Sequence, residues 1–210
     1  MNLKERWLMS IYTKIVVICL TVSTLISCVT SEKTASQKNN QSTENEQRVL
    51  DSEELILEFM TMLKMDLKKS LKQHSPENAI NACNQSAPFI AETINEKYGW
   101  KIGRTSLKLR NQSNKPDAWE ARVMKSFSER RADGEAIQDL SHFEIITENG
   151  VKNFRYMKAI PTMTVCLKCH GENVSEAVKA RLKKVYPDDK AVNFKFGDIR
   201  GAFTVTQKVE

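Results

Sequence analysis

The segment that starts at Asp51 has the hydrophobic periodicity of a helix, and this feature restricts the fold more than any other. A second helix is expected to start at Ser75-Pro76, where a capping oxygen precedes a proline at the first helical position. That helix is expected to end near Gly99 and to kink at Pro88. In the first helix the apolar side chains recur at intervals of three and four residues: Leu55, Phe59, Met62, Leu63, Leu67 and Leu71. The pattern predicts two long helices at the start of the folded part.

Short segments with the character of strands follow these helices. An Asn149-Gly150 pair lies between two of them and is a strong hairpin signal. Two shorter helices are expected at about 118–127 and 175–186. The strand-like segments are 100–109, 143–146, 154–160 and 201–207. Two long helices followed by about five short strands predict an α+β domain built on an antiparallel sheet.

The first 27 residues have the organisation of an export signal. A charged start precedes an uncharged run of twelve residues, Ile15–Ile26, which spans about 18 Å as a helix and falls short of a hydrocarbon core of about 30 Å. The run therefore predicts a signal peptide rather than a membrane span. Leu25-Ile26-Ser27-Cys28 resembles the bacterial lipobox, so Cys28 is the expected lipidation site. An uncleaved signal anchor and an ordinary signal with an incidental cysteine are the alternatives.

The next segment, residues 28–48, is polar and offers almost nothing that could be buried. Such a composition predicts a disordered tether, which leaves residues 49–210 as the folded domain. Without residues 1–27 the chain has 29 basic and 25 acidic side chains, a net charge of +4. This mild excess argues against a dedicated nucleic-acid-binding protein. We expect an exported protein, lipid-anchored to a bacterial membrane, whose domain faces the periplasm or the cell exterior.

The sequence Cys166-Leu-Lys-Cys169-His170 has the C-x-x-C-H spacing of covalent c-type haem attachment. One turn places both sulfur atoms beneath the two vinyl groups, while the next residue points its imidazole at the iron. Haem c is attached outside the cytoplasm, so the motif and the export signal agree. Three alternatives remain: a structural disulfide, a thioredoxin-like pair, for which no βαβ unit precedes the motif, and half of a zinc site, for which no second ligand pair is found.

The pattern leaves the second axial ligand open. Met163 lies three residues before the motif, on the side of the porphyrin that the imidazole already occupies, and Met157 lies in a strand and could face either way. His74 lies in a loop and His142 at a polar strand start, where exposure is more usual than ligation. Cys83, on a helix face of small residues, is either a ligand or a small buried side chain. These candidates are Met163, Met157, His74, His142 and Cys83.

Several further stretches, in order between about residues 80 and 205, extend the pattern: Ala82-Cys83 with Ala87-Pro88, Gly103–Ser106, Arg110-Asn111, Asn114–Asp117, Trp119-Glu120, Cys166–Gly171, Tyr186–Asp189 and Gly197–Gly201. Together they resemble the single-haem c-type cytochrome family with a PAS-like sheet. The resemblance implies a PAS-like fold and one haem c held at Cys166 and Cys169. It also implies axial ligation by His170 and Cys83. Two turn positions depart from the family pattern: Gln112 stands where proline is expected and Asn193 where glycine is more usual.

These features predict a membrane-anchored, extracytoplasmic haem protein that senses redox state or small ligands, or carries single electrons. Arg104 and Arg110 are candidates for contacts with the haem propionates, and a solvated basic strand face is the alternative. The expected partners are a redox protein and the membrane, but no nucleic acid. A thiol–disulfide oxidoreductase acting through Cys166 and Cys169, and a haem-free lipoprotein interaction module, are the competing functions. The scattered carboxylates form no acid–base pair, so no enzymatic reaction is predicted.

Overall fold

The computed structural model describes residues 40–72 and 76–209, and the chain divides into two units, residues 1–48 and 49–210. Of the expected tether only residues 40–48 are described, and they are helical, so this part of the expectation is wrong. Side chains one turn apart support the helix: Arg48 lies 3.6 Å from Glu44, and Ser42 donates to Glu46 at 3.2 Å. The signal segment, Cys28 and the tether residues 28–39 lie outside the described residues.

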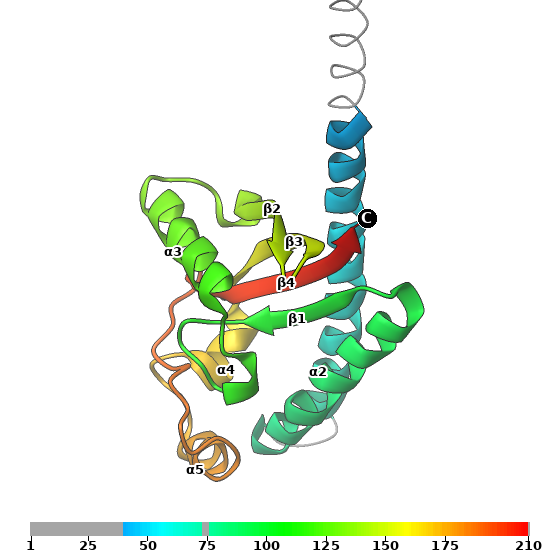
Figure 1. Cartoon of the computed structure of the whole chain (residues 1–210). Coiled ribbons are helices and arrows are strands. Elements are labelled where there is room, and N and C mark those ends of the chain that lie inside the picture. The colour runs from blue at the N-terminus through cyan, green and yellow to red at the C-terminus, as the bar shows by residue number, and fades with distance from the viewer. Residues whose placement is uncertain (1–39, 73–75, 210) are drawn as a thin grey trace, which may run out of the picture. The chain divides into compact units, whose positions relative to one another are not determined.

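Two long helices precede the sheet, as the sequence predicts (Figure 1). The first is helical over residues 40–72, and the second, α2, spans Pro76–Tyr98 and begins at the predicted proline. α2 contains Pro88 and ends before Gly99, whose φ of +70° is typical of the residue that terminates a helix. No helix in the described ranges is both long and apolar enough to cross a bilayer.

A four-stranded antiparallel sheet forms the centre of the domain, in the order β1-β4-β3-β2, where about five strands were predicted. The strands are β1 (Lys101–Thr105), β2 (Ser141–Glu148), β3 (Val151–Pro161) and β4 (Ile199–Val209). Asn149 and Gly150, with φ of +52° and +76°, form the predicted two-residue hairpin between β2 and β3. The last strand in the sequence, β4, therefore lies inside the sheet between β1 and β3.

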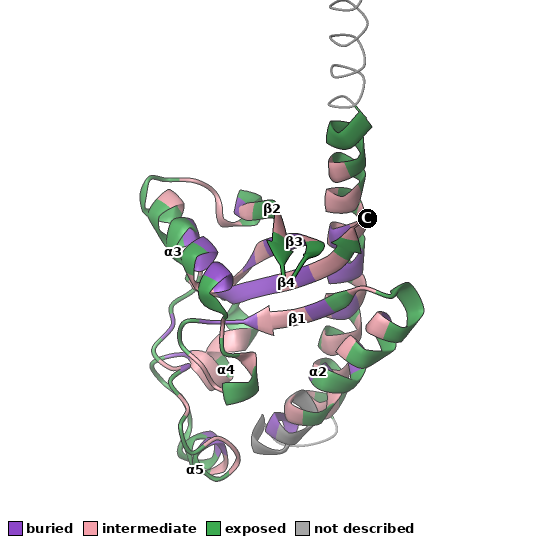
Figure 2. Ribbon diagram, in the orientation of Figure 1, coloured by how far each residue is buried: buried purple, intermediate pink, exposed green. Residues whose placement is uncertain are grey.

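Helices cover both faces of the sheet, and the side chains of β3 alternate between them. Phe154 and Tyr156 pack against the first helix and α2, whereas Met157 and Ala159 pack against α3 (Ala118–Ala132). Figure 2 shows the buried residues along β4 and on the side of α3 that faces it. The phenol of Tyr156 also donates to Glu53 of the first helix at 2.8 Å. The outcome is an α+β domain in which helices enclose the sheet.

Two short helices complete the domain near the C-x-x-C-H segment. α4 (Leu167–His170) is a single turn, and α5 (Glu176–Val185) begins at Ser175, whose side chain accepts from the Val178 amide. α5 packs against α2 through a third apolar cluster, made of Ile80, Val174, Val178 and Leu182. Cys169 packs against this cluster. The start of α2 and the motif therefore lie next to each other.

Candidate functional site

The C-x-x-C-H segment forms one continuous turn at the junction of a 3₁₀ helix, Thr164–Cys166, and α4. Cys166 and Cys169 are half-buried and carry free thiols rather than a disulfide. Burial raises the pKa of the Cys169 thiol. The glycine that follows the motif is sterically required, because a Cβ at Gly171 would lie 2.6 Å from the carbonyl oxygen of Leu167. The backbone therefore holds both sulfur atoms one turn apart.

The imidazole of His170 is held in one orientation. Its Nδ1 lies 2.8 Å from the carbonyl oxygen of Ala191, and its ring meets that of Phe194 edge-on at 6.2 Å. A carbonyl oxygen only accepts, so Nδ1 carries the proton and Nε2 presents its lone pair. Burial, together with the nearby guanidinium groups of Arg200 and Arg110, lowers the pKa of His170 well below its ordinary value. This neutral tautomer is the one that binds a metal through Nε2.

Arg110 connects three segments around the motif. Its Nε donates to Asp189 at 3.0 Å, and its Nη2 donates to the carbonyl oxygens of Cys169 at 2.6 Å and Ala191 at 3.1 Å. Its Nη1 lies 3.3 Å from Nε2 of His170. The side chains of Arg110 and Asp189 are only 12% and 10% exposed. Arg110 therefore fixes the position of the motif relative to the segment around residue 190.

The segment after Asp189 runs alongside His170 and closes one side of the site. The Phe194 amide donates to the His170 carbonyl at 2.9 Å, and the Asn193 amide donates to the Gly171 carbonyl at 3.3 Å. Asn193 has φ of +59°, in the left-handed region that glycine and asparagine adopt most readily. Asparagine tolerates this backbone conformation, so the departure from the glycine that the resemblance leads one to expect leaves the turn without strain.

Two further arginines lie near His170, one predicted and one missed. Arg104, predicted from the sequence, is half-buried on β1, and its guanidinium lies 5.5 Å from the ring centre of Phe59. Arg200 is the second residue of β4, and the sequence motifs predict no role for it, although it belongs to the Gly197–Gly201 stretch that carries the resemblance. Its guanidinium lies 5.2 Å from the Phe194 ring centre, and burial with Arg110 and Arg104 nearby lowers its pKa to about 10.

The structure places the candidates for the second axial ligand at different positions relative to the C-x-x-C-H segment. Met157 is fully buried against α3, Met163 is 48% exposed, and exposed His142 lies 3.9 Å from Glu144. His74 lies outside the described residues. Cys83 is part of α2, one turn after Ile80, but its side chain is not among those described. Because Ile80 belongs to the cluster against which Cys169 packs, the helix that carries Cys83 lies beside the motif.

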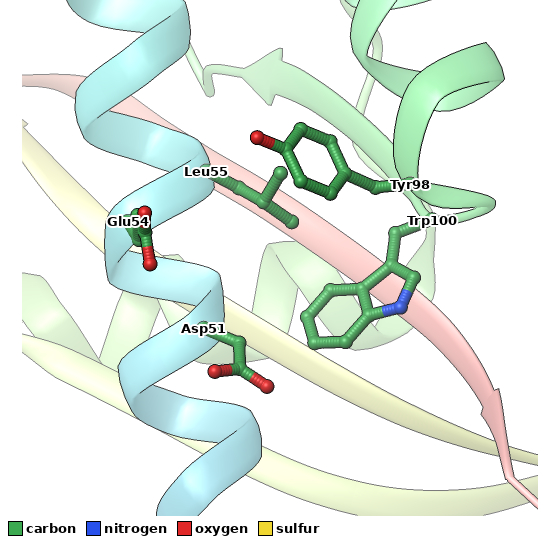
Figure 3. Close-up of a pocket in the computed structure, with 5 residues that line it drawn as sticks. All are labelled: Asp51, Glu54, Leu55, Tyr98 and Trp100. Carbon is green, nitrogen blue, oxygen red and sulfur yellow. The ribbon is translucent and has the colours of Figure 1, made fainter.

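A small pocket of about 180 Å³ lies at a different place, lined by Asp51, Glu54, Leu55, Tyr98 and Trp100 (Figure 3). In Figure 3 the rings of Tyr98 and Trp100 lie opposite the first helix, which carries Asp51 and Glu54. No residue of the C-x-x-C-H segment lines this pocket. In the described part of the chain, no group of three or more histidine, cysteine, aspartate or glutamate side chains is placed to hold a metal ion.

Comparison with known proteins agrees with the arrangement of these elements. Residues 35–207 match the model of the Tll0287-like family. Among solved structures, the crystal structure of the cyanobacterial heme-protein Tll0287 matches with a TM-score of 0.59 and 20% identity, over 78% of this chain and 96% of that one. No curated protein matches the chain. The family model covers most of the sequence, so the chain belongs to the Tll0287-like family.

Proposed function

We propose that this chain is a membrane-anchored, extracytoplasmic protein with one covalent haem c on a PAS-like domain, acting as a redox or ligand sensor or as a single-electron carrier. The observation that carries the proposal is the Nε2 lone pair of His170, fixed at the end of a one-turn C-x-x-C-H segment. The similar solved structure is that of a heme-protein, which supports the proposal.

The residues present fit this cofactor. Cys166 and Cys169 lie one turn apart with free thiols, which suits attachment to the two vinyl groups. The Nδ1–H of His170 donates to Ala191, so Nε2 is the nitrogen that would bind iron, in place of its 3.3 Å contact with Nη1 of Arg110. Guanidinium groups nearby suit carboxylates. When bound, the haem supplies one-electron redox chemistry.

We propose different roles for Arg110 and Arg104. Arg110 already donates to Asp189 and to two backbone carbonyls, so we assign it the positioning of His170. Arg104 keeps its proposed role as a propionate contact. The basic-face alternative for Arg104 would leave the haem unaffected by its substitution.

Cys83 is our proposed second axial ligand. α2 packs beside the motif through Ile80, three residues before Cys83. At its other end α2 is bonded to the first helix, because Tyr98 donates to Glu58 at 2.8 Å and Lys97 donates to Glu58 at 3.0 Å. If Cys83 holds the iron, a change at this residue would act on a helix that is connected to the N-terminal helix, and this connection supports the proposal of a sensor over a simple carrier.

The haem assignment is tested by expressing the full chain with a cytochrome c maturation system and staining a denaturing gel for haem peroxidase activity. Thioether-bound haem migrates with the protein, so the wild type should stain and the Cys166→Ala/Cys169→Ala variant should not. Cys83→Ala serves as the matched cysteine control and should still stain, because its sulfur forms no thioether. A blank wild-type lane would overturn the proposal and favour the thiol–disulfide oxidoreductase, which insulin reduction by the purified protein would then detect.

The anchor is tested separately. Cys28→Ala should abolish incorporation of radiolabelled palmitate and move the protein from the membrane fraction to the soluble fraction. Palmitate labelling that persists in Cys28→Ala would remove this residue as the lipidation site.

A further inference from the structure

Two helices carry exposed lysines that form no ion pair with another described residue. Four lie on the last turns of the first helix and two on α5, and we call them the basic end: Lys64, Lys68, Lys69, Lys72, Lys183 and Lys184. Other exposed helical charges are paired within one turn, as Lys125 is with Glu129 at 4.0 Å and Lys179 with Glu176 at 2.8 Å. Lysines four residues apart repel one another, so helix stability does not explain this arrangement.

The two groups of lysines lie on either side of the start of α2. Three residues separate Lys72 from Pro76, so the end of the first helix lies within about 14 Å of the first residue of α2. One turn later, Ile80 packs against Val178 and Leu182 of α5. In Figure 1 the first part of α2 and α5 lie together at the bottom of the view. The lysines of both helices therefore gather at one end of the domain.

The positive charge of the chain is concentrated in these two segments. Residues 64–72 hold four lysines and one aspartate, and α5 holds four basic side chains and one glutamate, so each segment has a net charge of +3. Without residues 1–27 the whole chain has +4, so all its other residues together have −2. A charge gathered in this way attracts an acidic surface and orients it during encounter.

The basic end adjoins the C-x-x-C-H segment. Cys169 packs against the apolar cluster that joins α5 to α2. Lys168, between the two cysteines, is exposed as well. A partner bound to α5 would therefore lie beside the position proposed for the haem.

The course of the first helix favours a protein partner over the membrane. Val49 packs against the core cluster that contains Phe59 and Tyr156. Lys72 follows 23 residues later on the same helix, a rise of about 35 Å. Cys28, the proposed lipidation site, precedes Val49, so the chain leads to its anchor from the opposite end of this helix.

We propose that the basic end docks the acidic surface of a redox protein, an inference that rests on the proposed function because it names the partner of that site. One electron passes between the partner's redox centre and the haem iron, so that one is oxidised as the other is reduced. Met65 is 66% exposed among the lysines of the first helix and adds an apolar contact to this charged surface.

The test uses the full chain with Cys28→Ala, matured with haem c, and flavodoxin, an acidic one-electron carrier, as the probe. Isothermal titration calorimetry measures the dissociation constant at low and at physiological salt. Lys64→Gln/Lys68→Gln/Lys72→Gln should weaken binding at low salt about tenfold, because three exposed charge pairs are lost. Salt should weaken wild-type binding and narrow this difference.

The matched control removes three exposed lysines from the strands β1, β3 and β4: Lys101→Gln/Lys152→Gln/Lys208→Gln. It should bind flavodoxin as the wild type does, whereas Lys183→Gln/Lys184→Gln should weaken binding about fivefold. Equal losses in the control and in the variant of the first helix would overturn the docking surface. Absence of wild-type binding at low salt would overturn it too.

Sedimentation with phosphatidylglycerol vesicles tests the membrane as the other occupant. Vesicle binding that the variant of the first helix loses, without flavodoxin binding by the wild type, would overturn the protein partner and assign the basic end to the membrane. Calorimetry detects docking whether or not the chain holds haem. Salt-dependent docking by a chain that lacks haem would therefore overturn the proposed function and leave the docking surface in place.

Discussion

His170 and Arg110 share one acceptor: the carbonyl oxygen of Ala191 lies 2.8 Å from Nδ1 of the imidazole and 3.1 Å from Nη2 of the guanidinium. Both groups are therefore positioned by one backbone atom of the segment that follows Asp189. Asp189 binds Arg110, and Arg110 donates to the Ala191 carbonyl that also accepts from His170. The carboxylate of Asp189 therefore helps to orient the imidazole indirectly. The site depends on a contact between two residues that are 79 positions apart in the sequence.

Arg110→Gln should destabilise the domain by on the order of 3 kcal/mol, because it leaves Asp189 buried without its ion-pair partner. Urea unfolding of the haem-free protein measures the free energy of unfolding. The Arg110→Gln/Asp189→Asn double variant should recover part of the loss. An Arg110→Gln protein that is as stable as the wild type would show that the ion pair of Arg110 and Asp189 does not stabilise the domain.

Cys83→Ala should shift the Soret band of the ferric protein and raise its midpoint potential, because a thiolate ligand stabilises ferric iron. Optical redox titration of the matured protein measures both quantities. Met163→Ala is the control, since its exposed side chain is not proposed to reach the iron. A ferric spectrum identical to that of the wild type would remove Cys83 from the iron.

Gly201→Ala should cost about 3 kcal/mol, because its Cβ would lie 2.3 Å from the carbonyl oxygen of Thr105 and the two strands would have to separate. Gly103→Ala is the matched control in the paired strand β1, where a Cβ meets Thr204 at an ordinary 3.6 Å. That substitution should be neutral, or should stabilise by about 0.5 kcal/mol. Thermal unfolding of both variants gives the comparison, and equal melting temperatures would refute the steric argument.

Glu53→Gln should reduce stability at neutral pH and flatten the acid limb of the stability curve. The hydrogen bond from Lys158, followed by that from Tyr156, lowers the pKa of Glu53 below its ordinary value of 4.5. A carboxylate with a lowered folded pKa stabilises the protein fully above its unfolded pKa and loses this contribution as the pH falls through the folded pKa. Its side chain is 40% exposed, so the contribution is at most about 1 kcal/mol.

Urea unfolding at pH 7 and at pH 3 measures this difference. Glu54→Gln, at an exposed position on the same helix, is the control and should leave the pH dependence unchanged. A Glu53→Gln protein that loses stability with acid as steeply as the wild type would contradict the expectation.

Local signals predicted most of the elements because their causes are local. The proline at the start of α2, the glycine after its end and the Asn149-Gly150 turn each fix backbone angles without help from the rest of the chain. The motif turn was predictable for the same reason, since its spacing is contained in five residues.

The errors have two kinds of cause: local side-chain bonds that hydrophobic periodicity does not reveal, and, for Arg200, contacts between distant segments. The strand expected over 100–109 ends at Thr105, because the Ser106 side chain accepts from the Lys108 amide and turns the chain. Residues 40–48 form a helix although they have no apolar face, because side-chain pairs one turn apart support it. Arg200 was missed because nothing near it in the sequence reveals a charge cluster that forms only when β4 pairs with β1.

The inner position of β4 has a consequence for biogenesis. Residues 199–209 follow the other three described strands in the chain, yet β1 and β3 both pair with them. Among the described strands, β4 is the neighbour of β1, so β1 cannot join the sheet before this segment has been synthesised. The C-x-x-C-H segment precedes β4, so it is synthesised before the sheet beside it can close.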